Sequence, residues 1–368
     1  MTIRILQVVN SMNRAGLETM LMNYYRNINR DKIQFDFLTH RSFEGDYDKE
    51  IEKLGGRIYH APRLYPHNYL EYFKFMSSFF KQHPEYKIVH SHIDSMSYLP
   101  LLAAKKANVP IRIAHSHNTS IDFDYKFILK EIFRFKIVDV ANEFCACGYD
   151  AGKYLFRGKK NFLIIPNAID KSSFIFNSDI RKKIRKKYKL GNQLVIGNVG
   201  RMTHQKNQAF LVKILFALRE KGINASLILI GVGEEKANLE KLANKLNINK
   251  NILFLGKRND VNDLYQAMDV FVMPSYYEGI PVVGIEAQFS GLPCLFSNAV
   301  PNEVAFNGKT KFLSLKKSEK QWANEICKMS LNERNEKERI GINNEHYDIK
   351  KAHNILENFY LDLYSRFN

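Results

Sequence analysis

Two glutamates eight residues apart, Glu278 and Glu286, flank a short segment that has the composition of an anion-binding site. The apolar, largely β-branched run at 270–273 predicts a buried parallel strand, and the proline after it ends that strand. A glycine and a second proline then predict a tight loop, and residues 282–289 predict the first turns of a helix. Glu278 is therefore expected at the carboxyl end of a strand, and Glu286 about one turn inside the following helix.

The start of that helix is the anion-binding part of the segment. The backbone N–H groups of Val282, Val283 and Gly284 precede the first intrahelical hydrogen bond, so they are available to bind a phosphate group. A carboxylate on each side could bind hydroxyl groups. A diphosphate with hydroxyl-rich groups at both ends, such as a nucleotide sugar, fits this arrangement. The alternative is a solvated loop acid followed by a helix-surface acid.

A second group of chemically useful residues follows the strand predicted at 194–199. Gly200 permits a sharp turn out of the strand, and Arg201 and Lys206 then bring two cations to one place. Two fixed cations and a helix start can stabilise the charge of a leaving diphosphate, a role that Mg²⁺ has in many enzymes. An ordinary surface arginine and lysine are the alternative.

These segments resemble motifs of the retaining glycosyltransferases of family 4, which have the GT-B fold. The resemblance rests on the two glutamates, on Gly200 with the two cations after it, and on the loop 13–18. In that loop Ala15 stands where the family usually has its first glycine. The resemblance covers nearly the whole chain and is weakest between residues 40 and 80 and after residue 300.

The resemblance implies a role for each matching residue. Arg201 and Lys206 would stabilise the leaving diphosphate, Glu278 would orient the donor sugar, and Glu286 would hold the nucleotide ribose. His117 would support charge near the reacting carbon. The other donor-binding residues that the resemblance implies are Gly16, Arg258, Val282, Val283 and Gly284.

Two histidine pairs, His90 with His92 and His115 with His117, end adjacent predicted strands. Four histidines this close also suit zinc, but no cysteine or acid completes an evident ligand set. We therefore expect no metal and no other cofactor, the nucleotide sugar being a substrate. We interpret His90 and His115 as structural histidines.

A further acidic motif, Asp122-Phe123-Asp124, imitates the Asp-x-Asp metal motif of the other large glycosyltransferase fold. It precedes a predicted basic helix, so acids at a helix N-terminus explain it without a metal.

Strand-like and helix-like runs alternate along the chain, which predicts an α/β protein with doubly wound parallel sheets. The pattern restarts after a basic segment, so two Rossmann-like domains facing each other across a cleft are expected. We predict an N-terminal acceptor-binding domain at 1–172, a C-terminal nucleotide-sugar-binding domain at 173–349, and a terminal helix at 350–368 that crosses back to the first domain. The predicted strands are 4–10, 35–39, 57–60, 88–92, 111–115, 143–147, 164–165, 194–199, 225–230, 252–255, 270–273 and 293–297.

The composition is that of a globular protein, with 45% hydrophobic and 25% charged residues in 368. That length suits two domains. The N-terminal residues predict a strand rather than a signal peptide, and four scattered cysteines fit buried thiols in a reducing cytoplasm. A cytoplasmic protein, peripheral on the inner face of the plasma membrane, is the expected localisation.

The formal net charge of +17 is concentrated at 171–190, where eight lysines and arginines face one acid. The run 180–190 predicts a basic helix, either a solvated face or a surface attracted to an anionic membrane. Aromatic and basic helices predicted around 69–80 and 123–137 are either core elements or interfacial membrane contacts. No RNA-binding aromatic motif, zinc finger or helix-turn-helix pattern is present, so a nucleic-acid partner is not expected.

The sequence thus predicts a retaining, metal-independent glycosyltransferase that moves a hexosyl or N-acetylhexosaminyl group from a nucleotide sugar, most simply a UDP sugar. The acceptor implied is a lipid-linked glycan in the synthesis of a capsule or exopolysaccharide. Two alternatives stay open. One is a GT-B nucleotide-sugar epimerase, and the other is a catalytically inactive scaffold that binds the donor within a polysaccharide assembly complex.

Overall fold

The computed structural model describes residues 2–120, 126–157, 161–331 and 344–367. Its contacts divide the chain into two units. Unit 1 comprises Met1–Ala168 and Glu345–Asn368, and unit 2 comprises Ile169–Asn344. The Asp122-Phe123-Asp124 motif lies outside the described residues. The domain limits at 172/173 and 349/350 stay predictions.

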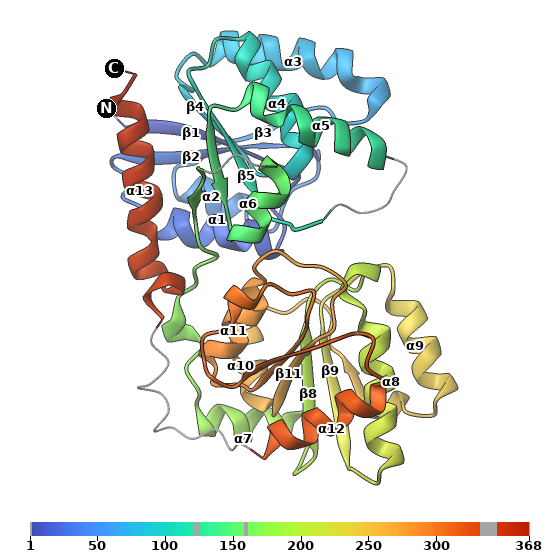
Figure 1. The fold of residues 1–368 in the computed structure, drawn as a ribbon. Coiled ribbons are helices and arrows are strands. Elements are labelled where there is room, and N and C mark those ends of the chain that lie inside the picture. The colour runs from blue at the N-terminus through green and yellow to red at the C-terminus, as the bar shows by residue number, and fades with distance from the viewer. Residues whose placement is uncertain (1, 121–125, 158–160, 332–343, 368) are drawn as a thin grey trace. The chain divides into compact units, whose positions relative to one another are not determined.

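Unit 1 is built on a seven-stranded parallel sheet with the order β3-β2-β1-β4-β5-β6-β7 (Figure 1). Its central strands are nearly continuous runs of buried residues, because helices cover both faces of a parallel sheet. The strands are β1 Ile3–Val9, β2 Ile33–Thr39, β3 Ile58–His60, β4 Ile88–Ser91, β5 Ile111–Ser116, β6 Glu143–Ala146 and β7 Leu163–Ile164.

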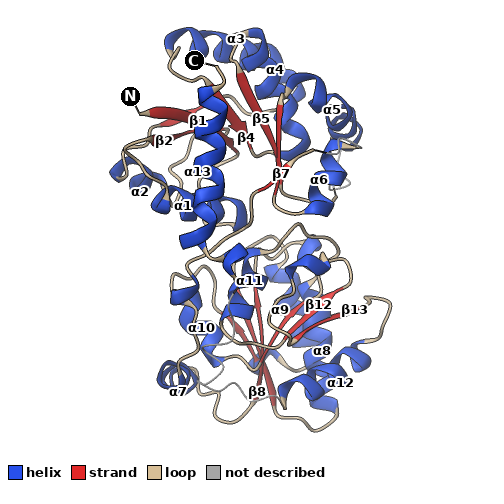
Figure 2. Ribbon diagram, turned by 60° about the vertical axis from the view of Figure 1, so that its left-hand side comes forward, coloured by secondary structure: helices blue, strands red, loops and turns tan. Residues whose placement is uncertain are grey.

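The helices of unit 1 form two hydrophobic clusters, one on each face of this sheet. In β1, Ile5 and Val9 belong to the cluster with α1 and the terminal helix α13, while Leu6 and Val8 belong to the cluster with α3 to α6. Figure 2 shows α13 lying along the sheet of unit 1. The helices are α1 Gly16–Asn27, α2 Asp48–Lys53, α3 Tyr69–Gln82, α4 Tyr98–Lys106, α5 Phe127–Val140, α6 Tyr149–Phe156 and α13 Ile349–Ser365.

Unit 2 repeats the architecture with a six-stranded parallel sheet of order β10-β9-β8-β11-β12-β13. Its strands are β8 Leu194–Val199, β9 Ala225–Ile230, β10 Ile252–Phe254, β11 Val270–Met273, β12 Cys294–Ser297 and β13 Thr310–Leu313. Its helices are α7 Ser178–Lys187, α8 Gln208–Glu220, α9 Lys236–Lys245, α10 Val261–Ala267, α11 Val282–Phe289 and α12 Glu319–Ser330. Short 3₁₀ turns in the chain are Pro66–Asn68, Asp94–Ser97, Lys171–Ser173, His204–Lys206, Asn249–Asn251, Asn302–Val304 and Glu345–Tyr347.

The strand order reverses once in each sheet, between β1 and β4 in unit 1 and between β8 and β11 in unit 2. At such a reversal the loops after the two neighbouring strands leave in opposite directions, and a ligand site opens at the carboxyl ends. The segments after β1, β8 and β11 carry most of the residues predicted to act, whereas His117 follows β5 and Arg258 follows β10. Topology therefore brings those residues to the place in each sheet where a ligand is expected.

The predicted fold class is confirmed, including two Rossmann-like sheets and a terminal helix that belongs with the first of them. Three elements were not predicted: α6, β13 and α12. Strand β13 is a four-residue edge strand without a clear apolar run. Helix α12 has a readable start, because Ser318 and Gln321 form a reciprocal capping box.

The basic helix α7 is partly a structural element of unit 2. Arg181 donates to Asp269 at 2.5 Å and to two backbone carbonyl groups. Arg185 pairs with the same carboxylate at 3.3 Å and also donates to the carbonyl of Ala267 at 2.8 Å. The lysines between and after these arginines are exposed. Two of the basic residues therefore attach the helix, and the exposed lysines form most of its charged outer face.

We predict that Asp269→Asn lowers the free energy of unfolding by roughly 2–3 kcal/mol, because it leaves two partly buried guanidinium groups without their shared carboxylate. Chemical denaturation of the full chain measures this loss of stability. The matched control is Asp179→Asn on the same helix, whose pair with Lys182 is 3.4 Å long and almost fully exposed. Such exposed pairs contribute little, so the control should shift the transition much less. Equal shifts would contradict the structural role of α7.

Candidate active site

Lys206 and Glu278, which the sequence placed in separate motifs, meet in unit 2. The Lys206 ammonium donates to Oε1 of Glu278 at 2.6 Å, and their side chains are 20% and 6% exposed. Lys206 ends the 3₁₀ turn after β8, and Glu278 lies in the loop after β11. Because β8 and β11 are neighbours in the sheet, the strand reversal brings the two loops together.

One backbone hydrogen bond and two from side-chain amides to backbone carbonyl groups hold these two loops together. The N–H group of Tyr276 donates to the carbonyl of Gln205 at 2.9 Å, and the Gln205 amide donates to the carbonyl of Tyr277 at 2.9 Å. Asn207, in the left-handed conformation with φ of 52°, donates to the carbonyl of Pro274 at 3.0 Å. The rings of His204 and Tyr276 stack with centroids 4.9 Å apart. The charged pair therefore sits in a loop structure that is held by contacts within unit 2.

Arg201 has the opposite environment. Its side chain is exposed, and no carboxylate pairs with it among the residues that the structure describes. Its backbone is fixed by the loop after β9, because a Cβ on Gly231 would lie 2.1 Å from the carbonyl oxygen of Gly200. A Cβ on Gly233 would lie 2.1 Å from the carbonyl oxygen of Met202. Sequence reasoning missed this loop, although a Gly-x-Gly directly after a strand was the available signal.

The start of helix α11 is available to an anion at its first two residues. No acceptor is recorded within the described chain for the backbone N–H groups of Val282 and Val283. Gly284 differs from the prediction, because its N–H group donates to the carbonyl of Pro281 at 3.0 Å. A Cβ at Gly284 would lie 3.1 Å from the ring of Phe296. This glycine therefore allows the helix to pack closely on β12.

Glu286 lies one turn into α11 and is held by a tyrosine that the sequence did not reveal. The hydroxyl of Tyr265 in α10 donates to Oε2 of Glu286 at 2.9 Å. Loss of hydration raises the pKa of Glu286 to about 7, and the Tyr265 hydrogen bond opposes that rise. The carboxyl group therefore loses its proton less readily than an exposed glutamate does.

Arg258 follows β10 and forms a paired contact with Asp260, at 2.7 Å from Nε and 2.6 Å from Nη2. This ion pair raises the pKa of Arg258 and lowers the pKa of Asp260. The pair with Asp260 uses two of the N–H donors of the guanidinium, so the role of Arg258 in donor binding stays a prediction.

In unit 1, the loop after β1 leads to Gly16, which is exposed and is the first residue of α1. Ala15 is the extended N-cap residue, with φ of −135°, and its side chain makes no capping hydrogen bond. The absence of a Cβ at Gly16 leaves the helix start open to close approach by a ligand.

The two histidine pairs gather in unit 1 as one cluster. Residues two apart on a strand point to the same face, so His90 and His92 share a face with His115 and His117. Ring centroids are 4.1 Å apart within each pair. His90 lies 3.1 Å from His115, and His92 lies 3.0 Å from His117, between ring nitrogens. This is the face that carries α1 and α13.

Burial keeps these rings neutral. It lowers the pKa of His117 to about 3 and lowers the pKa values of the other three histidines well below the ordinary range. The backbone of His117 is fixed by Asp94, whose Oδ1 accepts from its N–H group at 2.9 Å. Asp94 adopts the left-handed conformation, with φ of 46°, and was missed by sequence reasoning. It also accepts from the Asn118 amide at 2.7 Å.

A metal ion is the alternative use of this cluster. His90, His92 and His115 each offer a ring nitrogen, and these atoms lie within 4.8 Å of one another. Four hydrogen bonds, however, use both nitrogens of His90 and of His92. A metal would have to replace those bonds, and among the residues that the structure describes no carboxylate or thiolate joins the group. The expectation of a metal-free site stays a prediction.

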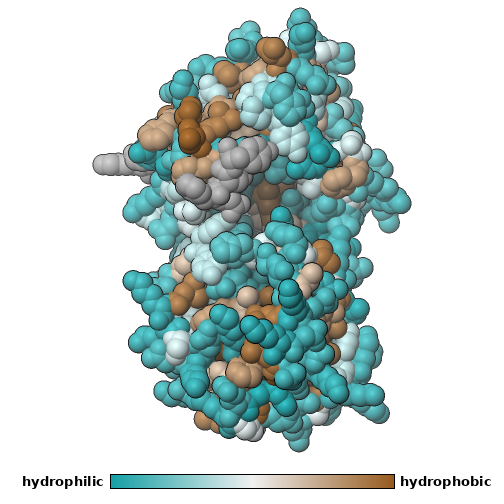
Figure 3. Space-filling view, turned by 90° about the vertical axis from the view of Figure 1, so that its right-hand side faces the viewer, coloured by the Kyte–Doolittle hydropathy of each residue, from teal (hydrophilic) through white to brown (hydrophobic). Residues whose placement is uncertain are grey.

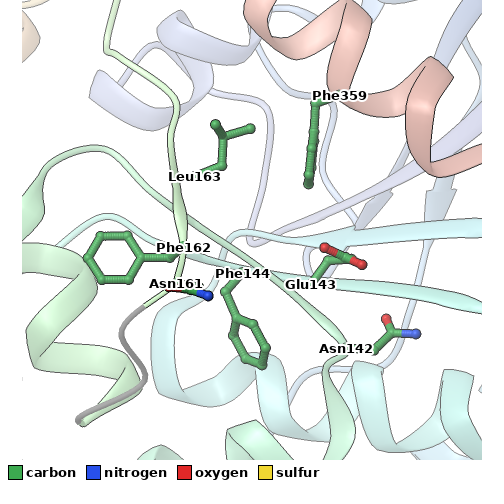
Figure 4. A pocket seen from close by; sticks show the side chains of 7 residues that line it. All are labelled: Asn142, Glu143, Phe144, Asn161, Phe162, Leu163 and Phe359. Atoms are coloured by element: carbon green, nitrogen blue, oxygen red, sulfur yellow. The ribbon is translucent and has the colours of Figure 1, made fainter.

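A cavity of about 690 Å³ in unit 1 lies elsewhere (Figure 4). It is bordered by Phe359 of α13 and by residues at the amino ends of β6 and β7. Ligands of parallel sheets bind at the carboxyl ends of strands, and none of the predicted site residues lines this cavity. Its lining residues are Asn142, Glu143, Phe144, Asn161, Phe162, Leu163 and Phe359.

Comparisons with known proteins identify the family to which this chain belongs. The family model described as glycosyl transferases group 1 matches residues 180–347. The putative glycosyltransferase EpsF of Bacillus subtilis is 39% identical over 347 residues, which cover 92% of this chain and 90% of that protein. This chain is a group 1 glycosyltransferase.

Two further relatives have more specific names. The capsular polysaccharide biosynthesis glycosyltransferase CapH of Staphylococcus aureus is 29% identical, over 89% of this chain and 90% of its own length. An Escherichia coli UDP-Gal:α-D-GlcNAc-diphosphoundecaprenol α-1,3-galactosyltransferase is 30% identical, over 58% of each chain. Among solved structures, Anabaena HepE in complex with UDP-glucose has a TM-score of 0.80 at 18% identity, covering 97% of this chain and 99% of that one. This structural similarity shows that the two proteins share a fold.

We predict that the stability of the glycosyltransferase falls as pH rises from about 4.5 to about 7 through the contribution of Glu286. Its pKa is higher in the folded chain than the usual 4.5, so the folded state binds the proton more tightly, and that advantage is lost above the folded pKa. Glu286→Gln should flatten the fall in Tm over this window. The control is Glu240→Gln in the same unit, where the carboxylate is 47% exposed and pairs only loosely with Lys236, at 3.5 Å. An unchanged pH profile in Glu286→Gln would contradict the assignment.

Proposed function

We propose that this glycosyltransferase transfers a sugar with retention of configuration from a UDP sugar to a lipid-linked glycan during synthesis of a cell-surface polysaccharide. The observation that carries the proposal is the Lys206–Glu278 contact of 2.6 Å beside the open start of α11. One turn further along that helix stands a second carboxyl group, Glu286. The names of the CapH and galactosyltransferase relatives support the acceptor class and the UDP donor.

Each residue has a physical task in this proposal. The helix start at Val282 and Val283 and the ammonium of Lys206 receive the diphosphate, whose negative charge grows as the bond to the sugar breaks. Arg201, exposed and without a carboxylate partner among the described residues, adds a second cation. Glu278 orients hydroxyl groups of the sugar. Because fixed cations and N–H groups perform the task of a divalent ion, we propose that the reaction needs no metal.

Glu286 receives the ribose in this proposal. An ionised carboxylate accepts from two adjacent hydroxyl groups, whereas the protonated acid has one oxygen that donates. Since its pKa is about 7 in the free protein, ribose binding near neutral pH selects the ionised form and releases a proton.

Retention follows without an enzymic nucleophile if the acceptor attacks from the face that the diphosphate leaves. The bond between the anomeric carbon and the phosphate oxygen breaks as the bond to the acceptor oxygen forms. The acceptor proton passes to the departing phosphate oxygen, so charge and atoms balance. His117, neutral and fixed by Asp94, supports the positive charge that develops at the anomeric carbon. We propose that the chain belongs to family 4 and shares its retaining chemistry.

The epimerase and the inactive scaffold are the competing functions. An epimerase needs no acceptor, so its products would form from the nucleotide sugar alone. A scaffold would bind the donor without turnover, and it would have no need for a buried lysine–carboxylate pair, which is costly to maintain. That cost favours the active transferase.

We predict that Lys206→Ala and Glu278→Ala each lower slow nucleotide release from the cognate donor by about 10²–10³-fold, because each removes a group that acts on developing charge or sugar orientation. Release is measured over a panel of UDP, GDP and dTDP sugars, with and without EDTA. EDTA should have no effect on the wild-type rate.

The matched control is Lys213→Ala, whose lysine pairs with Glu319 on the surface of the same unit at 3.7 Å. It should release nucleotide at the wild-type rate. Tight donor binding with no turnover, even with lipid extract supplied as acceptor, would favour the scaffold. Loss of activity in EDTA, restored by a divalent ion, would overturn the metal-free mechanism.

The proposal includes attachment of unit 1 to an anionic membrane, where a lipid-linked acceptor resides. Ile128, Ile132 and Phe135 are 75%, 46% and 55% exposed on α5, and their spacing of four and three residues puts them on one helix face. The guanidinium of Arg157 lies 3.5 Å from the centre of the Phe135 ring. Apolar surface appears in brown on the side of unit 1 that carries α5 (Figure 3). An apolar stripe with cations beside it is suited to a membrane interface. No helix within the described residues is long and apolar enough to span a membrane.

We predict that the double variant Ile128→Asp, Ile132→Asp binds vesicles containing anionic phospholipid at least about tenfold more weakly, because each side chain loses its apolar burial in the interface. Vesicle co-sedimentation measures this binding. Leu331→Asp is the matched control, with an exposed side chain in unit 2. It should sediment like the wild type, and equal binding by all three proteins would exclude this membrane contact.

A further inference from the structure

A buried glutamine on β1 begins two chains of hydrogen bonds in unit 1. Gln7 is fully buried on the face of the sheet that carries α13. In the first chain its amide nitrogen donates to the hydroxyl of Tyr360 at 3.1 Å. That hydroxyl lies 2.6 Å from Nδ1 of His90, and Nε2 of His90 lies 3.1 Å from Nδ1 of His115. The chain runs from α13 through β4 to β5.

The second chain leaves from the other end of the same amide. Oε1 of Gln7 lies 2.8 Å from Nε2 of His92. Nδ1 of His92 then lies 3.0 Å from Nε2 of His117. This chain ends at the histidine that the proposed function assigns to the reacting carbon.

The direction of every hydrogen bond follows from the Gln7 amide, because each neutral imidazole has one N–H donor and one bare nitrogen. Oε1 of Gln7 can only accept, so His92 donates from Nε2 and its Nδ1 is bare. A bare Nδ1 must accept, so His117 donates from Nε2 and its own Nδ1 is bare. In the first chain Tyr360 accepts from the amide, so its single proton goes to His90.

We propose that Gln7 and Tyr360 are positioning residues that fix His117 in the tautomer with its proton on Nε2 and a lone pair on Nδ1. The proposal rests on the proposed function only for the task of His117, since the tautomer is a property of unit 1 alone. It gives a role to Tyr360, on the terminal helix, and to Gln7, which no motif of the sequence indicates.

The tautomer matters because it determines whether the Nδ1 side of His117 presents a partial negative or a partial positive charge to a substrate. Nε2 is occupied by His92, so Nδ1 is the ring nitrogen left for a substrate. A bare nitrogen has partial negative charge, accepts from a sugar hydroxyl and favours positive charge developing at a nearby carbon. The opposite tautomer would present an N–H group, which repels that charge. The histidines are not expected to stabilise charge by becoming protonated. Burial disfavours the charged ring, and two protonated rings with centroids 4.1 Å apart would repel each other.

Two-bond ¹H–¹⁵N correlation spectra of the ¹⁵N-histidine-labelled full chain read the tautomer directly, with His117→Gln used to assign the signal. We expect wild-type His117 to be protonated on Nε2 at neutral pH. Protonation on Nδ1 would overturn the proposal, because it would mean that the Gln7 amide has the reverse orientation. Zinc retained by the purified protein on these ring nitrogens would also overturn it, since the metal would take the lone pairs.

Tyr360→Phe removes the hydroxyl that accepts from the Gln7 amide and pairs with His90. We expect a mixture of His117 tautomers, a kcat about tenfold lower and an unchanged KM for the donor. The control is Tyr24→Phe, another buried tyrosine of the same hydrophobic cluster, whose hydroxyl donates to the carbonyl of Pro166 at 2.8 Å. It should keep both the wild-type spectrum and kcat.

The two readouts separate the two proposals. Equal spectra and kcat values in Tyr360→Phe and Tyr24→Phe would contradict the positioning role. If wild type turns over no donor, the proposed function fails while the wild-type spectrum still decides the tautomer. If Tyr360→Phe does not fold, that same spectrum remains the deciding measurement.

Discussion

The contact between Lys206 and Glu278 is the interaction on which the active-site loops of unit 2 depend. A carboxylate that is only 6% exposed needs a cation, and here the cation comes from the loop of a neighbouring strand. The two loops can reach each other because the strand order reverses between β8 and β11. Hydrogen bonds from one backbone N–H group and two side-chain amides then fix the approach of the loops. Helix α11 begins at Val282, four residues after Glu278. Topology, electrostatics and anion binding are thus consequences of one arrangement.

Much of this fold could be predicted from the sequence, because parallel strands buried on both faces are short apolar runs. Helix α11 was predicted with its observed bounds, since a proline and a glycine-containing loop mark its start. Glu278 and Lys206 were predicted as site residues from their places after strands. The edge strand β13 could not be found in this way, because few of its residues are deeply buried. Gly284 could not be interpreted correctly either, since the nearness of Phe296 is a tertiary contact.

The histidine cluster also depends on tertiary contacts that the sequence does not reveal. The spacing of His90 and His92, and of His115 and His117, predicts that each pair shares one sheet face. What the spacing cannot provide is the partner on that face. Tyr360 lies 353 residues from Gln7 along the chain, and the amphipathic pattern of its helix indicates a buried side without naming what it covers. The roles of Gln7, Tyr360, Asp94 and Tyr265 depend on contacts between elements that are distant in sequence.

The two units solve opposite electrostatic problems with similar topology. Unit 2 has ionised groups near its strand reversal, and in the proposed function the cations and N–H groups there would balance the negative charge of a diphosphate. Unit 1 keeps four imidazoles neutral near its own reversal, because added positive charge would oppose a carbon that becomes positive. A neutral ring can still stabilise that carbon if its bare nitrogen is the one presented. In the proposed network, the direction of the hydrogen bonds decides which nitrogen of His117 is bare. The side-chain amide of Gln7 can set that direction, because one of its ends donates and the other accepts.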